Sequence, residues 1–259
     1  MPSAQELFEQ GIQCFDIGDL AGAITKFTDS ILVQPKAESY YNRAYVREHM
    51  GDLLGAIQDY TEAIRLNPGY ADAFNSRGWL YDKLHETSKA IQDFSTAIAI
   101  NPNHDLAYNN RGVVKMHSGD LDGALEDYDM AIGINFYHPF AFHNRALVRV
   151  KKEDYSGAVA DYTQAIRIDP ADPDLYVKRG AAKADMGDFA GADQDFTTSI
   201  KINQRHAEGY YFRGMLREEQ GDIKGAFKDY LRAAKLDKDI GVKLIHRIDL
   251  LAKEISSGI

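Results

Sequence analysis

The chain has 259 residues, of which 44% are hydrophobic and 27% charged, and its formal net charge is -9. No apolar run approaches the roughly 18 residues of a membrane span, so we expect no membrane insertion. The acidic balance argues against a nucleic-acid-binding surface, because proteins that bind nucleic acids concentrate Lys and Arg on one face.

Residues 1–10 lack the basic and apolar segments of an export signal. We therefore expect a cytoplasmic protein, although a chain trimmed of its leader would look the same. Cys14 is the only cysteine, which excludes an intrachain disulfide framework and a cysteine-based zinc site.

An alanine followed four residues later by an aromatic ring occurs seven times, with a spacing of 34 residues, or once 33. The pairs are Ala23/Phe27, Ala56/Tyr60, Ala90/Phe94, Ala124/Tyr128, Ala158/Tyr162, Ala192/Phe196 and Ala226/Tyr230. A period of this length that fills most of a chain is typical of a solenoid, in which each repeat contacts only its neighbours.

Residues 108–135 illustrate one repeat. Tyr108, Gly112 and Lys115 share one helical face, Gly119 and Asp120 interrupt the pattern, and apolar residues with helical spacing then resume it. This pattern indicates a helix, a tight turn and an antiparallel second helix. Within a single array over 1–259, the predicted repeats span about residues 4–36, 37–70, 71–104, 105–138, 139–172, 173–206 and 207–239, and a capping helix follows at 240–259.

We number the positions of a repeat so that the recurring alanine is position 20 and the first helix covers positions 1–14. Position 8 is always glycine or alanine, which predicts a close approach of the two helices, with position 8 facing the alanine at position 20. Aromatic residues occupy position 24 in all repeats and position 4 in all but the first, which indicates packing between helices.

Small residues at positions 8, 20 and 27, aromatic residues at 4 and 24, and proline at 32 together resemble the tetratricopeptide repeat family over about residues 4–238. The resemblance implies an all-α fold, an α-solenoid that forms a right-handed superhelix of about seven antiparallel helix pairs. It also implies a concave groove, lined mostly by first helices, that binds peptides or partner proteins. It implies no catalysis.

An arginine at position 7 and an aspartate at position 23 occur together in repeats two to seven, and the first repeat lacks both. The pairs are Arg43/Asp59, Arg77/Asp93, Arg111/Asp127, Arg145/Asp161, Arg179/Asp195 and Arg213/Asp229. Their joint presence predicts an ion pair that joins the two helices of one repeat. The alternative is a row of arginines that binds anions.

In the resembling family, positions 2, 5, 6, 9, 12 and 13 of the first helices face the groove. We expect a peptide- or partner-binding groove lined by Asn42, Tyr45, Asn75, Trp79, Asn109, Asn110, Val113, His143, Asn144 and Leu147. Amides both donate and accept hydrogen bonds, so a spaced row can bind the main chain of an extended peptide. This asparagine row is similar to that of the O-linked N-acetylglucosamine transferase family. The alternative is that these residues cap helices or cover neighbouring side chains.

The junction at residues 135–140 departs from the repeat pattern, because Phe136 takes the place of the expected proline at position 32. Aromatic residues thus crowd what should be a polar turn. Phe136, Tyr137 and Phe140 either add packing between repeats or form an exposed anchor for a partner.

A carboxylate clamp for chaperone C-terminal tails, the best-defined ligand mode of the resembling family, requires Lys, Arg or Asn at five positions of three consecutive repeats. Counted from the first repeat, the chain offers Phe8, Ile12, Asn42, Asp72 and Ser76 at these positions. Only Asn42 fits, and later starting points fit no better. The sequence therefore argues against binding of chaperone tails.

Residues 240–255 read as one more helix with apolar residues on more than one face. The last repeat of a solenoid needs a cover over its exposed interface, so we expect this helix to cap the array. The alternative is a homo-oligomer contact between two copies of the chain.

The sequence contains no zinc-protease motif, phosphate-binding loop or dinucleotide fingerprint. We therefore expect no catalytic residue, no cofactor and no metal. The function that the sequence favours is a non-catalytic scaffold for protein–protein interaction, which binds an extended peptide or partner protein in its groove. The alternative is a self-assembling structural or adaptor protein that oligomerises through its terminal repeats.

Overall fold

The computed structural model describes residues 1–257, which form fifteen α-helices and no strand. The structure divides into two compact units, Met1–Phe136 and Tyr137–Ile259, here called the N-terminal and C-terminal units. Residues 258 and 259, the end of the predicted capping helix, lie outside the described part. None of the helices within residues 1–257 combines the length and the apolar character of a membrane span.

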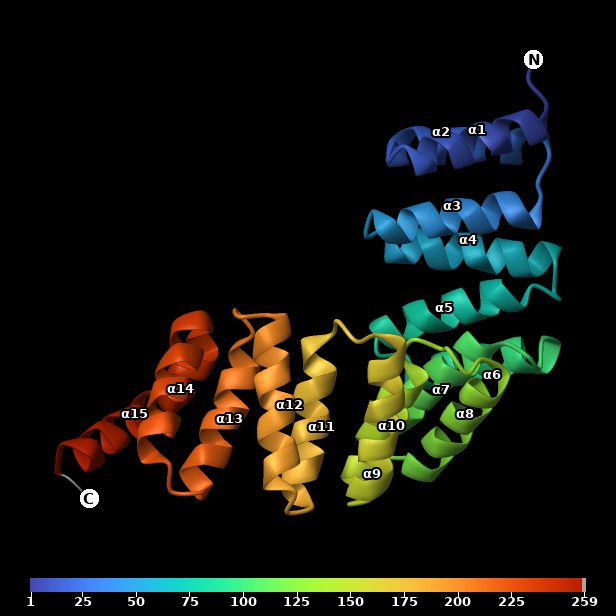
Figure 1. The fold of residues 1–259 in the computed structure, drawn as a ribbon. Helices are drawn as coiled ribbons and strands as arrows, with labels where there is room; N and C mark the ends of the chain where they lie inside the picture. The colour runs from blue at the N-terminus through green and yellow to red at the C-terminus, as the bar shows by residue number, and fades with distance from the viewer. Residues whose placement is uncertain (258–259) are drawn as a thin grey trace. The chain divides into compact units, whose positions relative to one another are not determined.

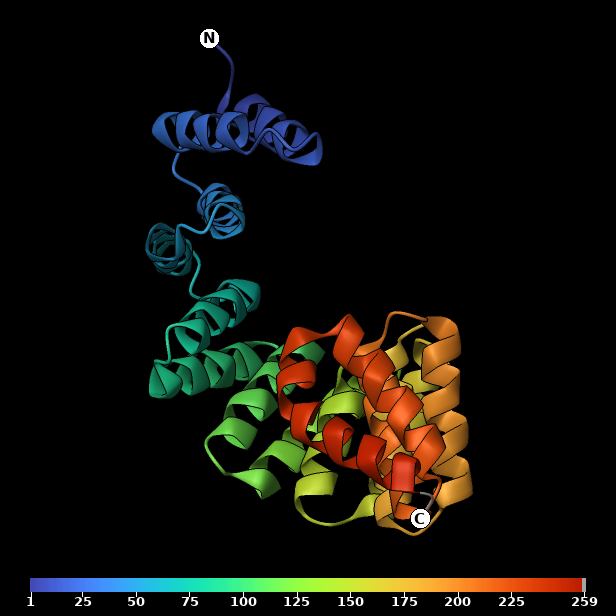
Figure 2. The ribbon, with the colours of Figure 1, turned by 90° about the vertical axis from the view of Figure 1, so that its left-hand side faces the viewer.

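The N-terminal unit consists of four helix pairs, one for each repeat (Figure 1). Its helices are α1 (Ala4–Asp16), α2 (Leu20–Val33), α3 (Ala37–His49), α4 (Leu53–Leu66), α5 (Ala71–Lys83), α6 (Thr87–Ile100), α7 (Asp105–His117) and α8 (Leu121–Ile134). Each first helix packs on the second helix of its own repeat, and that second helix contacts the first helix of the next repeat. The two helices of a pair lie side by side in Figure 1 and in Figure 2.

The C-terminal unit consists of three helix pairs and one additional helix. Its helices are α9 (Ala141–Lys151), α10 (Tyr155–Ile168), α11 (Pro173–Asp185), α12 (Phe189–Ile202), α13 (Ala207–Glu219), α14 (Ile223–Leu236) and α15 (Lys238–Ser257). The additional helix α15 packs on α14 and buries Leu244 and Leu251. The stacked helix pairs confirm the predicted all-α solenoid fold.

The turn inside most repeats is a glycine in the left-handed conformation followed by a capping aspartate. Gly119 has a φ of +88°, and the Asp120 carboxylate accepts a hydrogen bond of 3.0 Å from the backbone N–H of Gly123. This confirms the predicted turn, in which glycine adopts a positive φ without steric cost and aspartate caps the second helix. In the third and fifth repeats, His85 and Glu153 take the place of the glycine, at φ values of 59° and 61°.

The small residue at position 8 lies against the aromatic ring at position 24. A Cβ atom added to Gly112 would lie 2.8 Å from the Tyr128 ring, and the other position 8 glycines show the same neighbour. The sequence analysis did not predict this ring as a neighbour of position 8. In the second repeat, Ala44 at position 8 and Ala56 at position 20 belong to the same buried cluster as Tyr60. Ala44 and Ala146 occupy position 8 in the second and fifth repeats, so the fold accommodates one methyl group there.

The predicted ion pair between positions 7 and 23 is confirmed in repeats two to seven. In the fourth repeat, Nε and Nη2 of Arg111 donate to the two carboxylate oxygens of Asp127, at 2.9 and 2.6 Å. The other five pairs have the same two-bond geometry, and all six aspartate side chains are at most 6% exposed. Two parallel charge-assisted bonds fix both the distance and the orientation of the two helices.

A second cation reaches most of these aspartates from position 11. Lys115 Nζ lies 2.9 Å from the Asp127 carboxylate. The equivalent residues in the other repeats are Arg47, Arg149, Lys183 and Arg217. The third repeat differs, because its position 11 is Tyr81 and Arg77 lies over that ring, 5.8 Å from its centroid.

The same arginines connect neighbouring repeats. Arg111 Nη1 donates to the Ser95 hydroxyl at position 25 of the preceding repeat, at 3.0 Å. Four more repeats make this bond, in which the acceptors are Thr28, Thr61, Thr163 and Thr197. Each guanidinium also lies 5.4–5.7 Å from the centroid of the ring at position 4. One arginine thus contacts both helices of its repeat and the repeat before it.

Replacing Asp127 with alanine is expected to lower the free energy of unfolding by about 3–5 kcal/mol, because two largely buried cations lose their counter-charge. Chemical denaturation followed by circular dichroism measures the change. Glu126→Ala, an exposed carboxylate one residue earlier on α8, is the control and should change stability by less than about 0.5 kcal/mol. Equal free energies of unfolding for the two variants would show that the ion pair does not stabilise the fold.

Burial raises the pKa of the tyrosine hydroxyls at position 24, namely Tyr60, Tyr128 and Tyr162, and raises that of Tyr230 to about 12. The unfolded-state pKa is about 10, so these groups contribute their full stability below pH 10 and lose it as the pH rises through the folded-state values. We therefore expect base-induced unfolding above about pH 10, with phenolate absorbance rising as the helical circular dichroism signal falls.

Tyr128→Phe is the matched variant for this titration. The Tyr128 hydroxyl is buried and has no hydrogen-bond partner within residues 1–257, so its removal should not lower stability at neutral pH. The variant should unfold at a higher pH than the unmodified chain. Complete phenolate formation with the helical signal unchanged would contradict the role of burial.

Candidate functional site

Four of the predicted groove residues surround one cavity of the N-terminal unit. The cavity has a volume of about 260 Å³ and is lined by Tyr45, Glu48, Asn75, Ser76, Trp79 and Asn110. These residues come from α3, α5 and α7, the first helices of three successive repeats. They occupy repeat positions 5, 6, 9 and 12, the positions that face the groove in the resembling family.

Trp79 and Tyr45 supply the apolar surface of this cavity, and each is 40% exposed. The indole Nε1 of Trp79 donates to Glu48 at 3.1 Å, and Lys83 Nζ lies 4.7 Å from the centroid of the Trp79 ring. The Tyr45 ring lies 5.5 Å from the ring of Phe15 and 4.4 Å from that of His49. Both rings are held in place while part of their surface stays open to solvent.

Glu48 also lines this cavity and was not among the groove residues predicted from the sequence. Besides the Trp79 indole it accepts a bond of 3.4 Å from the Tyr60 hydroxyl, and Lys83 Nζ lies 3.9 Å away. It fixes the indole of one repeat to the core tyrosine of the repeat before. Its repeat position could have predicted its place at the cavity, because position 12 faces the groove in the resembling family.

The asparagines of the predicted row bond mainly to one another and to their own helices. Asn110 Nδ2 donates to Asn75 Oδ1 at 3.1 Å, and Asn109, which is buried, donates to Asn110 at 3.5 Å. Asn42 Nδ2 donates to the backbone carbonyl of Glu38 in its own helix, at 2.8 Å. Within residues 1–257, the Nδ2 group of Asn75 donates to no protein acceptor, so its two N–H groups are available at the cavity wall.

The remaining predicted groove residues lie on α7 and α9. Val113 is half-buried on α7, and His143, Asn144 and Leu147 are half-buried on α9. Burial lowers the pKa of His143, and the charge of Lys178 lowers it further. Leu147 lines a second cavity, of about 250 Å³, which lies entirely within the C-terminal unit.

The aromatic residues of the junction between the fourth and fifth repeats are exposed. Phe136, Tyr137 and Phe140 are 53%, 74% and 61% exposed. Their rings therefore present apolar surface to solvent rather than filling a core.

A third cavity, of about 570 Å³, was not predicted from the sequence. It lies in the C-terminal unit among α11 to α15, and Phe212, Met215 and Leu216 supply part of its apolar surface. Glu218 accepts a 2.8 Å bond from the Tyr230 hydroxyl and pairs with Arg247 of α15. Phe212 and Met215 occupy positions 6 and 9 of the seventh repeat. These positions face the groove in the resembling family, so the sequence could have predicted both residues.

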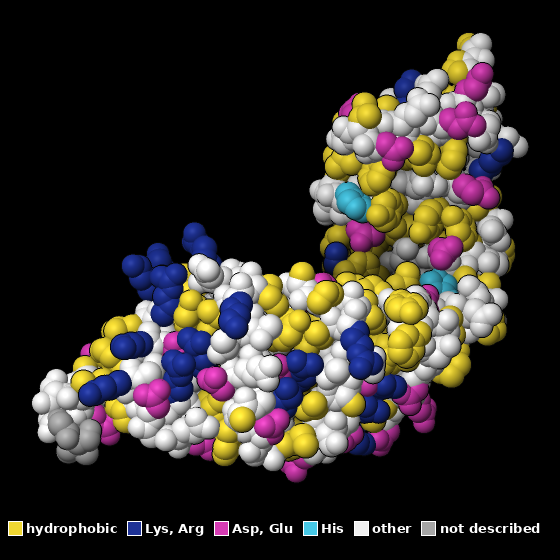
Figure 3. Space-filling view, in the orientation of Figure 1, with side chains coloured by type: hydrophobic (Ala, Val, Ile, Leu, Met, Phe, Trp, Pro, Cys, Tyr) yellow, Lys and Arg dark blue, Asp and Glu magenta, His cyan; other side chains and the backbone are white. Residues whose placement is uncertain are grey.

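The two units differ strongly in charge. Residues 1–136 contain 10 Lys and Arg against 20 Asp and Glu, a net charge of -10, whereas residues 137–259 contain 20 against 19, a net charge of +1. On the face shown in Figure 3, most of the visible Lys and Arg side chains lie over the C-terminal unit. The cavity around Trp79 therefore belongs to the acidic unit.

Solved structures with the same fold include a tetratricopeptide repeat protein from Parabacteroides merdae, with 24% identity and a TM-score of 0.68, where the match covers 96% of this chain and 98% of that one. YrrB, a TPR protein with an unusual peptide-binding site, matches at 20% identity and a TM-score of 0.62 over 75% of this chain and 97% of its own. PilF of Pseudomonas aeruginosa matches at 15% identity and a TM-score of 0.71 over 85% and 97%.

No curated protein sequence matches the chain. Models of the tetratricopeptide repeat match residues 37–70, 71–104 and 177–240, and a model described as a TPR repeat matches residues 146–187. Together the matched segments cover more than half of the chain, and residues 37–70 and 71–104 each contain one helix pair. The chain therefore belongs to the tetratricopeptide repeat family.

Proposed function

We propose that the protein is a non-catalytic scaffold that binds an extended segment of another protein along the first helices of its N-terminal unit. The observation that carries this proposal is the cavity around Trp79, where two partly exposed aromatic rings lie beside amide groups. Proteins of this family are generally interaction scaffolds, and YrrB is described as having a peptide-binding site.

The cavity supplies both parts of a peptide site. The exposed surfaces of Tyr45 and Trp79 offer an apolar pocket for one anchoring side chain, and anchors of this kind dominate binding energy at protein interfaces. The free N–H groups of Asn75 can donate to the main-chain carbonyls of an extended segment. Within the C-terminal unit, Leu147 on α9 offers apolar surface of the same kind.

The charge of the N-terminal unit selects the class of partner. A net charge of -10 over residues 1–136 attracts Lys- and Arg-rich segments and repels acidic ones. Glu48 stands at the cavity itself, so a cationic side chain next to the apolar anchor meets a carboxylate there. The proposed ligand is an extended basic peptide with at least one large apolar residue.

Trp79 is the only tryptophan in the chain, so its fluorescence reports binding at this cavity alone. We expect tryptophan-free peptides rich in Lys and Arg to change its emission in a saturable way, and peptides of the same length rich in Asp and Glu to leave it unchanged. A higher salt concentration should weaken the binding of the basic peptides, because salt screens the attraction between charges. Asn75→Ala with Asn110→Ala should weaken binding roughly tenfold, the loss expected for one or two hydrogen bonds.

Asn103→Ala is the control for the double variant, since this exposed amide lies in the turn before α7. It should bind like the unmodified chain. Peptides that bind without affecting Trp79, or that bind the double variant equally well, would place the site elsewhere and contradict the proposal. Failure of every basic peptide to bind would contradict the charge argument.

Self-association through α15 is the second candidate function, and one observation favours it. Val242 and Ile245 of α15 are 75% and 65% exposed, although Leu244 and Leu251 of the same helix are buried. Two copies that share a twofold axis can cover the same apolar patch on each other.

If α15 self-associates, the sedimentation coefficient should rise with protein concentration, and Val242→Lys with Ile245→Lys should abolish that rise without loss of helical signal. The control is Leu231→Lys, a 45% exposed apolar residue on α14. A coefficient that does not depend on concentration would rule this candidate out.

A further inference from the structure

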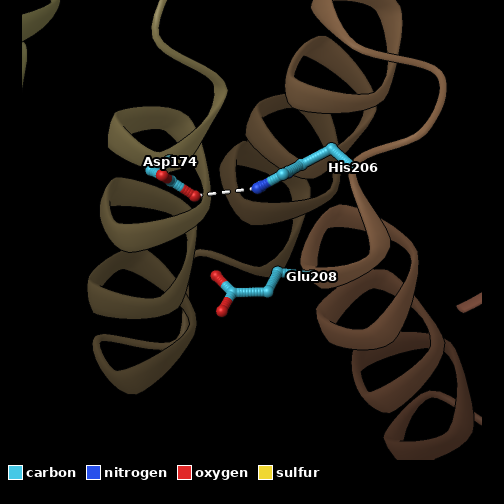
Figure 4. Close-up of side chains that lie close together, drawn as sticks. All are labelled: Asp174, His206 and Glu208. Atoms are coloured by element: carbon cyan, nitrogen blue, oxygen red, sulfur yellow. Dashed lines mark hydrogen bonds and ion pairs between the residues drawn. The ribbon is translucent and has the colours of Figure 1, made fainter. Parts of the chain in front are cut away.

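Three potential metal ligands meet where the sixth repeat joins the seventh. Asp174 lies at the start of α11, His206 immediately precedes α13, and Glu208 lies in the first turn of α13. Figure 4 shows Asp174 and His206 pointing toward each other, and the Glu208 side chain extending toward the helix that carries Asp174. One ligand atom from each residue lies within 4.8 Å of the corresponding atoms of the other two.

The imidazole of His206 is held on both of its nitrogens. Its Nε2 lies 2.8 Å from a carboxylate oxygen of Asp174, and its Nδ1 lies 2.8 Å from the hydroxyl oxygen of Ser199. Ser199 is fully buried at position 27, where five other repeats carry alanine. A bond from Nδ1–H to a fixed second group orients a histidine for metal binding through Nε2.

The chain contains a matched histidine–aspartate pair that lacks the third group. His104 and Asp72 occupy the same repeat positions as His206 and Asp174, and His104 Nε2 lies 3.2 Å from the Asp72 carboxylate. The residue equivalent to Glu208 is there Leu106. An ordinary ion pair between the two ends of one repeat accounts for His104 and Asp72, and for His206 and Asp174, but it gives no role to Glu208.

Glu208 adds a second carboxylate to the cluster, and Lys178 lines the same cavity as Glu208 without forming an ion pair with it in the described part of the chain. Within residues 1–257 Glu208 forms no salt bridge, and the only one that Asp174 forms is with His206. Two carboxylates around one imidazole leave negative charge that a bound cation would offset. One nitrogen and two oxygen ligands form a site that suits Zn²⁺, which binds such ligands at roughly 2.0–2.2 Å and keeps a further position open for water in three-ligand sites.

We propose that Asp174, His206 and Glu208 form a binding site for Zn²⁺ or a similar divalent transition-metal ion. The ion takes the place of the proton between His206 and Asp174, while Nδ1–H of His206 donates to Ser199. Its ligands come from two repeats, and their helices α11 and α13 already contact each other. The bound ion therefore joins the sixth repeat to the seventh.

The site also touches the candidate partner-binding surface of the C-terminal unit. Glu208 lines the cavity of about 250 Å³ that contains Leu147 and Phe212. Metal binding fixes the Glu208 carboxylate at the edge of this cavity. The open coordination position can accept water or a carboxylate or imidazole of a bound partner.

Isothermal titration of the full, metal-free chain with Zn²⁺ tests the proposal. We expect one equivalent to bind, and Asp174→Asn, His206→Gln or Glu208→Gln to weaken this binding by roughly tenfold or more. The control is His104→Gln, which removes the matched histidine and should leave the affinity unchanged. Glu208→Leu, which copies the composition of the His104 junction, should weaken binding as much as Glu208→Gln does.

Thermal unfolding gives a second measurement on the same variants. Zn²⁺ should raise the unfolding temperature of the unmodified chain and of His104→Gln, but not of His206→Gln, because a ligand that binds only the folded state stabilises it. Mg²⁺ at the same concentration should have no such effect, since it favours all-oxygen sites. Asp174 and Glu208 are exposed, so their variants should fold normally. The proposal is overturned if no Zn²⁺ binds, or if His206→Gln and His104→Gln behave alike.

Discussion

The buried carboxylate at position 23 determines how one repeat packs on the next. An aspartate enclosed between two helices needs fixed donors, and a guanidinium with two parallel N–H groups satisfies both of its oxygens. In Arg111 the remaining nitrogen reaches Ser95 of the preceding repeat, and the guanidinium lies against the Tyr108 ring. The first repeat carries Gln10 and Lys26 at the two positions and therefore lacks this pair. The arginine that pairs with the buried aspartate thus also holds its repeat against the preceding one.

This use of positions 4, 7, 8 and 11 for the core leaves positions 5, 6, 9 and 12 of the first helices free to vary. Position 12 shows what that variation does, because Glu48 and Glu218 both accept a bond from the core tyrosine of their own repeat. The second partner of Glu48 is the partly exposed indole of Trp79, whereas that of Glu218 is Arg247 of α15. The same carboxylate therefore holds an aromatic anchor in one unit and the terminal helix in the other.

Features fixed within one repeat could be predicted from the sequence, because they recur with its period. The Gly119–Asp120 turn follows from local backbone preferences, and the Arg111–Asp127 pair follows from residues that occur or are missing together. The Tyr128 ring next to Gly112 was not predicted, since periodicity gives the face of a helix but not which neighbouring side chain lies closest to a glycine. Contacts such as Glu48 with Trp79, or His206 with Asp174, join residues about 31 or 32 positions apart and depend on how one helix lies over the next.

The charge difference between the units has its origin outside the core. Each Arg–Asp pair is neutral, so the three pairs of residues 1–136 contribute nothing to their net charge of -10. The excess carboxylates lie at turns and on helix faces that the stacking does not use, among them Asp16, Asp52 and Glu126, all of which are exposed. Surface substitution can therefore change the charge of a unit while the core contacts stay intact. A scaffold built in this way keeps one fold and presents an acidic surface on one unit and a nearly neutral one on the other.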